Sequence, residues 1–371
     1  MKNAISGFFT INQHQYKSRW QQTISTLFAT IMLFCLFSVN GFVIRASAET
    51  TKNIASTIRE NITLIKSRDQ YKEETYQIQA NQNDHIKIKD ISKNNQNIYN
   101  LTYKKGSYCL SNLFPFHVYK ISRFSSADEL IEEYFIQPTN PRRFISTEYI
   151  INLRDLGGIK VNDGTNRYGI LYRGAQIPDY FTNRSRLDED LQIMQDLGIQ
   201  VEIDIRNNEE VQSTKDIKAK YAMQDQSFIA GAEYLQIPVN AYSDAVEMDN
   251  YKHDRTVSAL HAIIDSVNNG KVVYYHCAAG VDRTGTISFL LEGLLGADEQ
   301  SLDEDYGLQL TTQTKIYDSQ REYKKMKQYM FEYRGDNLQE KFFNWFIDSG
   351  FTEKELKQFQ AIMIGGGNHP N

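Results

Sequence analysis

A cysteine and an arginine stand six positions apart in a stretch of small residues, and this spacing suits phosphate chemistry. The stretch reads His276-Cys277-Ala278-Ala279-Gly280-Val281-Asp282-Arg283-Thr284-Gly285. Small side chains leave the backbone N–H groups free to turn inward, and Gly280 can adopt a positive φ. The planar guanidinium of Arg283 can hold two phosphate oxygens while the Cys277 sulfur attacks phosphorus. These residues therefore predict phosphate ester hydrolysis through a phosphocysteine intermediate.

The segments on either side of this loop predict a strand followed by a helix. Residues 272–275 form a short apolar and aromatic run, and residues 287–295 carry apolar side chains at helical spacing. A small-residue loop that ends on a helix N-terminus is an anion-binding site. The helix end and Arg283 both favour thiolate over thiol, so we expect Cys277 to be ionised at neutral pH. The expected phosphate-binding residues are Ala278, Ala279, Gly280, Val281, Asp282 and Arg283.

The pattern H-C-x5-R-[ST], formed by His276, Cys277, Arg283 and Thr284, resembles the signature loop of cysteine-dependent tyrosine and dual-specificity phosphatases. The segments N-x-R-D-L-G-G at 152–158 and L-Y-R at 171–173 resemble the bacterial tyrosine and lipid phosphatase family. The resemblance implies a protein tyrosine phosphatase-like α/β fold with a central sheet flanked by helices. It also implies hydrolysis without a cofactor and a phosphorylated protein or a phosphoinositide as substrate.

One loop residue departs from the family pattern. The family usually has Lys where this chain has Val281, and that cation is associated with binding the extra phosphates of phosphoinositides. Valine stands at the corresponding place in the related cysteine phytases, which act on inositol polyphosphates. We therefore expect phosphotyrosine first, with phosphoinositides and inositol polyphosphates as alternatives. An alternative of another class is a non-catalytic module that binds a phosphorylated ligand.

Aspartates in two segments compete for the role of general acid, which must protonate the leaving oxygen. Asp282 directly precedes Arg283, and the resemblance makes Asp282 the first choice. Asp244 is the alternative and Asp249 a further candidate, because both lie in the loop 240–254, where many tyrosine phosphatases carry a mobile general acid. The structural interpretation of Asp282 is a cap on the following helix.

The two residues that flank the loop have supporting roles in this interpretation. We expect His276 to hydrogen-bond to neighbouring backbone, to hold Cys277 in place and to help its ionisation. Thr284 either donates its hydroxyl to the Cys277 sulfur as that sulfur leaves phosphorus, or caps the helix. Both are therefore counted among the catalytic candidates.

Three charged residues near the second motif have two interpretations each. Arg154 and Asp155 form either a wall of the active site or a buried ion pair that fixes the turn at Gly157-Gly158. Arg173 makes either a phosphate contact or a structural pair. All three are kept as possible substrate contacts.

Composition limits the partners. The chain has 371 residues, 41% of them apolar, and a net charge of −5, so nucleic acid is not an expected partner. The histidines are scattered, and none joins cysteines or carboxylates at zinc-like spacing, so no metal site is expected.

The first 48 residues predict a signal peptide. They contain four basic residues and no acidic ones, an apolar run over 27–44 and the small-x-small sequence Ala46-Ser47-Ala48. The protein is therefore expected to be secreted, with a mature net charge of −9. The alternative is an uncleaved membrane anchor with the protein facing outside, since the run has the ~18 residues that can span a bilayer.

The remaining chain divides into three parts. Residues 49–142 are expected to form a small β-rich accessory domain, with a loosely helical segment at 50–66 and alternating strands at 76–89, 98–103 and 116–121. Residues 143–364 form the expected phosphatase domain, which ends in a series of helices. Residues 365–371 are expected to be a disordered tail.

Overall fold

The computed structural model describes residues 62–65, 75–92, 99–104, 106–162, 164–177, 184–207, 226–309 and 316–365. All of them belong to one compact unit, Ile58–Asn371. The predicted signal peptide and all but the first residue of the predicted tail lie outside the described residues, so export stays a prediction. No helix in the described ranges is long and apolar enough to cross a membrane.

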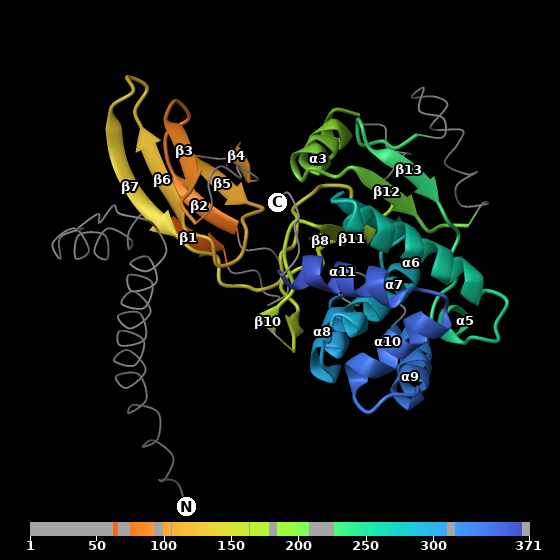
Figure 1. Cartoon of the computed structure of the whole chain (residues 1–371). Helices are drawn as coiled ribbons and strands as arrows, with labels where there is room; N and C mark the ends of the chain where they lie inside the picture. Colours follow the sequence, from red (N-terminus) through yellow and green to blue (C-terminus); the bar gives the residue numbers. More distant parts are fainter. Residues whose placement is uncertain are drawn as a thin grey trace, which may run out of the picture. The chain divides into compact units, whose positions relative to one another are not determined.

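The N-terminal part of the described chain consists of two antiparallel sheets (Figure 1). The strands of the first are, in order, β1 Ile62–Ile65, β2 Thr75–Gln79, β5 Ser107–Ser111 and β4 Asn100–Lys104. Those of the second are β3 His85–Asp90, β6 Tyr119–Phe124 and β7 Leu130–Ile136. Their buried apolar side chains, which include Ile78, Leu110 and Ile121, form a core of their own. The β-rich prediction for this part is confirmed.

Two details of the prediction for this part were wrong. The segment expected to be loosely helical contains β1, which pairs antiparallel with β2, so strand pairing overrides a weak helical spacing. The strand expected from residue 116 begins at Tyr119 instead. Phe116 has a φ of 64°, which is incompatible with an extended strand.

The C-terminal part is built on a five-stranded mixed sheet with the order β13-β12-β14-β11-β8. Its strands are β8 Arg154–Asp155, β11 Leu171–Ala175, β12 Val201–Asp204, β13 Glu233–Gln236 and β14 Val273–Cys277. All neighbours pair in parallel except β8, which runs antiparallel to β11. A two-stranded hairpin, β9 Lys160–Val161 with β10 Gly164–Thr165, lies outside this sheet. The predicted buried strand before the cysteine is thus the central strand.

Helices cover both faces of this sheet (Figure 1). Val273, Tyr275 and Cys277 belong to the larger core, whereas Tyr274 belongs to a second core with α3, so side chains alternate between the two faces as strand geometry requires. The described helices are α3 Arg184–Asp196, α5 Ser243–Val246, α6 His253–Asn268, α7 Asp282–Leu294, α8 Glu299–Gln309, α9 Ile316–Glu332, α10 Leu338–Asp348 and α11 Glu353–Ile364. The predicted α/β fold is confirmed, whereas the domain boundaries stay predictions.

The helix that follows the cysteine loop, α7, is packed too closely for a side chain at one of its positions. A Cβ added to Gly293 would lie 2.4 Å from ring atoms of Phe342, a fully buried residue of α10. Gly307 of α8 is different, because a Cβ there would meet nothing within 4 Å. The two glycines therefore make a matched pair for testing the packing of α7.

We expect Gly293→Ala to lower the free energy of unfolding by about 1–3 kcal/mol through overpacking. Gly307→Ala should raise it by up to about 1 kcal/mol, because alanine favours a helix interior over glycine. Urea unfolding followed by circular dichroism measures both changes. An unchanged unfolding midpoint for Gly293→Ala would show that α7 and α10 are less tightly packed than described.

Candidate active site

The loop predicted to bind phosphate connects the central strand to α7. Cys277 is the last residue of β14 and is only 2% exposed, and α7 begins five residues later at Asp282. Gly280 has a φ of 69°, and a Cβ there would lie 2.4 Å from the carbonyl carbon of Gly174 in β11. Both facts require glycine at this position. Arg283, the second residue of α7, is half-exposed.

The outer side of the loop is held through its carbonyl groups. The Gly280 carbonyl accepts hydrogen bonds from Asn152 Nδ2 at 2.7 Å and from Arg173 Nη2 at 3.1 Å. The Ala278 carbonyl accepts from the Gln176 backbone N–H at 3.3 Å. In a trans peptide the N–H points away from the C=O, so the N–H groups of Ala279 and Val281 face away from these partners. The contacts thus orient the loop amides as a phosphate site requires.

Arg154, Asp155 and Arg173 are all buried, as the structural interpretation of these residues requires, but the partners differ from those expected. Arg154 contacts both carboxylate oxygens of Asp305 in α8 at 3.3 Å, rather than contacting Asp155. Arg173 Nη1 donates to the same Asp305 carboxylate at 2.8 Å. Asp155 pairs with Arg143 instead, at 3.2 Å. The expected Arg154–Asp155 pair was therefore wrong, because Arg154 instead shares the Asp305 carboxylate of α8 with Arg173.

The carboxylate shared by the two arginines is strongly held in its charged form. Burial opposes ionisation of Asp305, but Arg154 and Arg173 outweigh that cost and hold its pKa well below the ordinary range. Burial, followed by repulsion from Arg173, lowers the pKa of Arg154 to about 10. Glu292 of α7 responds in the opposite sense, because burial and the neighbouring Asp305 charge raise its pKa well above its usual value.

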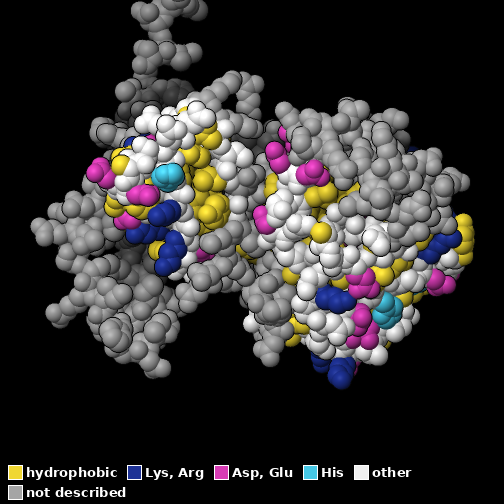
Figure 2. Space-filling view, turned by 90° about the horizontal axis from the view of Figure 1, so that it is seen from above, with side chains coloured by type: hydrophobic (Ala, Val, Ile, Leu, Met, Phe, Trp, Pro, Cys, Tyr) yellow, Lys and Arg dark blue, Asp and Glu magenta, His cyan; other side chains and the backbone are white. Residues whose placement is uncertain are grey.

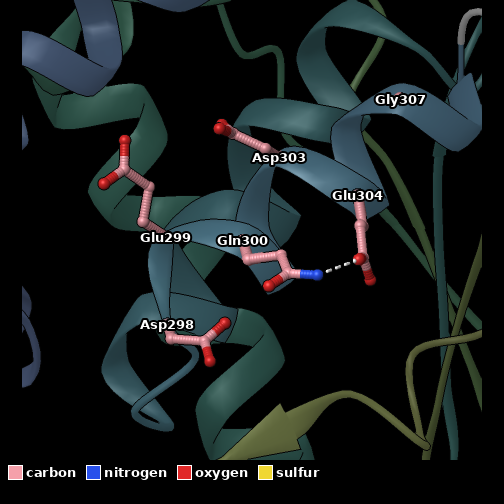
Figure 3. Close-up of a pocket in the computed structure, with 6 residues that line it drawn as sticks. All are labelled: Asp298, Glu299, Gln300, Asp303, Glu304 and Gly307. Carbon is pink, nitrogen blue, oxygen red and sulfur yellow. Dashed lines mark hydrogen bonds between the residues drawn. The ribbon is translucent and has the colours of Figure 1, made fainter.

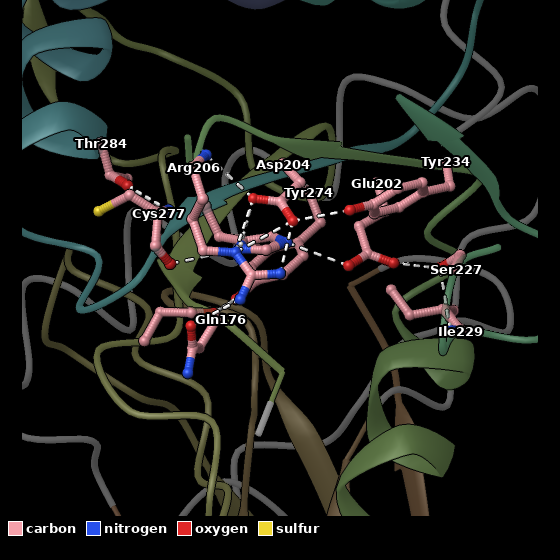
Figure 4. Close-up of polar contacts among 12 residues, drawn as sticks. Gln176, Glu202, Asp204, Arg206, Ser227, Ile229, Tyr234, Tyr274, Cys277 and Thr284 are labelled. Atoms are coloured by element: carbon pink, nitrogen blue, oxygen red, sulfur yellow. Dashed lines mark hydrogen bonds and ion pairs between the residues drawn. The ribbon is translucent and has the colours of Figure 1, made fainter. Parts of the chain in front are cut away.

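His276 and Thr284 both contact the backbone of Cys277. His276 Nδ1 lies 3.3 Å from the Cys277 carbonyl oxygen, which is the expected contact with neighbouring backbone. The Thr284 hydroxyl accepts from the Cys277 N–H at 2.9 Å. On its other side, His276 Nε2 lies 3.0 Å from Glu202 Oε1 of β12. Figure 4 shows the contact between Thr284 and Cys277, together with the Asp204–Arg206 pair at the end of β12.

Asp282 is held by residues that the sequence did not single out. The Tyr242 hydroxyl donates to Asp282 Oδ1 and lies 3.2 Å from the hydroxyl of Tyr306 in α8. Burial and the bond to Asp282 raise the pKa of Tyr242, so its phenol keeps the proton that it donates. Asp244, the alternative acid, contacts residues of its own loop, Lys252 at 2.5 Å and Asn250 at 3.2 Å. Of these two aspartates, Asp282 is thus the one that lies next to Arg283, at the start of α7.

A separate hollow lies along α8 and is lined by acidic side chains (Figure 3). Lys160 pairs with Asp298 at 3.2 Å, Lys327 pairs with both Glu299 and Asp303 at 2.7 Å, and Glu304 accepts a hydrogen bond from Gln300 at 2.8 Å. In the ranges that the structure describes, no group of three or more His, Cys, Asp or Glu side chains is placed to hold a metal ion.

The family model described as tyrosine phosphatase family matches residues 145–361. The chain belongs to the tyrosine phosphatase family. A search of curated proteins finds no match. Among solved structures, the chain is similar to TpbA of P. aeruginosa, with 17% identity over 48% of this chain and 86% of that one, at a TM-score of 0.30. It is also similar to the core catalytic domain of the PP-IP phosphatase SIW14 of S. cerevisiae in complex with citrate, with 15% identity over 54% and 96% and the same TM-score.

Membership of this family confirms the prediction of a cysteine-dependent phosphatase enzyme. The positioning residues Asn152, Glu202, Tyr242 and Asp305 were missed at the sequence level. Asn152 belongs to the second motif, so its position next to Arg154 offered a signal. Asp305 lies 132 residues from Arg173 and offered none.

Replacing Asp305 by Asn should cost about 3–5 kcal/mol at neutral pH, because two buried guanidinium groups lose their shared anion. The folded pKa of Asp305 is lowered, so its contribution is present above its unfolded value of about 3.9 and is lost as pH falls below that value. The difference between wild type and Asp305→Asn should therefore shrink below about pH 4. Urea unfolding at a series of pH values measures it.

Asp265→Asn, which changes an exposed aspartate of α6, is the control and should stay within about 0.5 kcal/mol of wild type at every pH. A loss of stability in Asp305→Asn that is equally large in acid would mean that lost packing, rather than lost charge, causes it.

Proposed function

We propose that this chain hydrolyses phosphotyrosine in proteins, with Cys277 as the nucleophile. The observation that carries the proposal is the position of Cys277 at the end of the central strand. There it opens a loop whose carbonyls are held from outside and whose next helix begins with Asp282 and Arg283. Inward amides, a helix N-terminus and a guanidinium together suit a phosphate dianion.

The reaction has two steps in this proposal. In the first, the Cys277 thiolate attacks phosphorus, the S–P bond forms, and the P–O bond to the tyrosyl oxygen breaks. The carboxyl group of Asp282 gives its proton to that oxygen. In the second, water attacks phosphorus and gives a proton to the Asp282 carboxylate, the S–P bond breaks, and inorganic phosphate leaves. Arg283 binds the non-bridging oxygens throughout.

The contacts of the two candidate acids favour Asp282. Asp282 accepts a hydrogen bond from Tyr242 at one oxygen, which fixes the carboxyl group on the helix that carries Arg283. Asp244 is bound at one oxygen by Lys252 and at the other by Asn250, both in its own loop, so its contacts hold it within that loop. The tyrosine contact therefore supports Asp282 as the general acid of this proposal.

The substrate proposal depends on Val281. The Val281 side chain is apolar and fully buried. The position that usually carries lysine in the family therefore presents no cation to a substrate. A phosphate group on a single tyrosine needs no second cation, whereas a phosphoinositide with several phosphates gains from one. This supports phosphotyrosine over phosphoinositides, whereas inositol polyphosphates stay an alternative, because the related cysteine phytases also have valine at this position.

Cys277→Ser should lower turnover of a phosphotyrosyl peptide at least about 1000-fold while binding of tungstate, a phosphate analogue, persists. Cys109→Ser is the control and should retain wild-type turnover, because Cys109 lies in β5 of another sheet. The same assay with phosphoinositide vesicles and inositol hexakisphosphate should show slower wild-type turnover. Faster turnover of either would reassign the substrate, and tungstate binding without turnover by wild type would make the protein a phospho-ligand binder.

Asp282→Asn should lower turnover of phenyl phosphate about 100-fold or more, and of p-nitrophenyl phosphate much less. The reason is that p-nitrophenolate is a stable leaving group that needs little protonation. Asp244→Asn is the matched variant and should leave both rates near wild type. If Asp244→Asn shows the dependence on leaving group and Asp282→Asn does not, the acid is Asp244.

A further inference from the structure

Both ring nitrogens of His276 face oxygen acceptors. Nδ1 lies 3.3 Å from the Cys277 carbonyl oxygen and 4.0 Å from Asp204 Oδ1, and Nε2 lies 3.0 Å from Glu202 Oε1. A backbone carbonyl cannot donate, so Nδ1 must carry a hydrogen. Nε2 either donates to the Glu202 carboxylate or accepts from a Glu202 carboxyl group. His276 and Glu202 together therefore carry two hydrogens at these contacts, one on Nδ1 and one between Nε2 and Glu202 Oε1.

The neighbours of Glu202 favour a carboxylate. The Ser227 hydroxyl donates a hydrogen bond to Glu202 Oε2, and Ser227 Oγ accepts from the Ile229 N–H at 3.0 Å (Figure 4). Glu202 is 2% exposed and His276 is 0% exposed, so water does not compete for these bonds. An imidazole also has a higher intrinsic affinity for a proton than a carboxylate has. The arrangement therefore describes an imidazolium paired with a carboxylate.

The other charged groups around the ring balance each other. Asp204 is bound by Arg206 through two nitrogens and by the Tyr234 hydroxyl at 2.7 Å. Burial opposes its ionisation, but His276 and Arg206 hold the pKa of Asp204 below the ordinary range. Tyr274 stacks on the imidazole with its ring centroid at 5.2 Å. Asp204 is thus shared between Arg206 and His276, whereas Glu202 is the carboxylate within hydrogen-bond distance of the His276 ring.

The contact to Cys277 runs through the peptide bond. His276 and Cys277 are adjacent in β14, so their side chains point to opposite faces of the sheet. The imidazolium reaches the Cys277 carbonyl, and the N–H of the same peptide, which belongs to Ala278, points the other way. A charged donor on the carbonyl fixes this peptide and polarises its N–H. That N–H is the first amide of the phosphate loop.

We propose that Glu202, oriented by Ser227, is a positioning residue that keeps His276 doubly protonated, so that an imidazolium grips the Cys277 carbonyl and supports the thiolate. The inference rests on the proposed role of Cys277 as nucleophile. It adds a carboxylate and a serine from other segments of the chain to the machinery of the loop.

The protonation of His276 and the reactivity of Cys277 test this inference without requiring turnover. In protein labelled with ¹⁵N-histidine, the His276 signals, identified by their loss in His276→Gln, should show a hydrogen on both nitrogens at pH 7. In Glu202→Gln, which keeps the size of the side chain but not its charge, one nitrogen should lose its hydrogen. The pH midpoint for alkylation of Cys277 by iodoacetamide should move up by about one unit.

Glu233→Gln is the control, because Glu233 is an exposed residue of the neighbouring strand paired with Lys271 at 2.8 Å, and it should keep the wild-type midpoint. If Glu202→Gln does not fold by circular dichroism, Ser227→Ala should give a smaller upward shift. The inference is overturned if His276 of the wild-type protein carries a hydrogen on only one ring nitrogen at pH 7. The inference is also overturned if folded Glu202→Gln has the same midpoint for Cys277 alkylation as the wild-type protein. If Glu202→Gln does not fold, the same result in Ser227→Ala overturns it. Failure of the proposed function would instead appear as full turnover in Cys277→Ser.

Discussion

The buried contact between Asp305 and two arginines is the interaction on which the phosphate loop depends. Asp305 comes from α8, Arg154 from β8 and Arg173 from β11, so one carboxylate fixes three elements in relation to one another. Arg173 then reaches the Gly280 carbonyl with its second nitrogen. Removing one partner of such a buried ion pair lowers the free energy of unfolding by more than the intact pair contributes, because a buried charge is left without a partner. The contact thus positions Arg173 to hold one of the loop carbonyls.

A second set of contacts approaches the loop from its other end. Tyr242 follows β13 and reaches Asp282 at the start of α7, and its backbone N–H donates to Thr286 Oγ1 of the same helix at 2.9 Å. Its φ of 60° is unusual for a tyrosine, and the three hydrogen bonds around it hold this conformation. Asp282 and Arg283 thus share a helix whose first turn is anchored by a neighbouring loop.

The sequence was sufficient for those parts of the site that are continuous in the chain. The strand, the loop and the start of α7 form one segment, an apolar run followed by a helical pattern, so the places of Cys277 at the strand end and of Arg283 on the helix followed directly. Partners distant in the chain did not follow, since nothing near residue 154 indicates that Asp305 would replace Asp155. Glu202 and Asp204 stand two apart in an apolar strand, which places both on one face. That spacing was the available signal for the His276 contacts.

The close approach of Gly280 to Gly174 has a consequence for how ligands are distinguished. The backbone of the loop rests directly on the backbone of β11, with no side chain between them to rearrange. The loop is therefore preorganised, and binding a phosphate group demands little ordering of the chain. Because every phosphate ester meets the same rigid cradle, discrimination among esters must come from the groups that surround its mouth and touch the rest of the substrate.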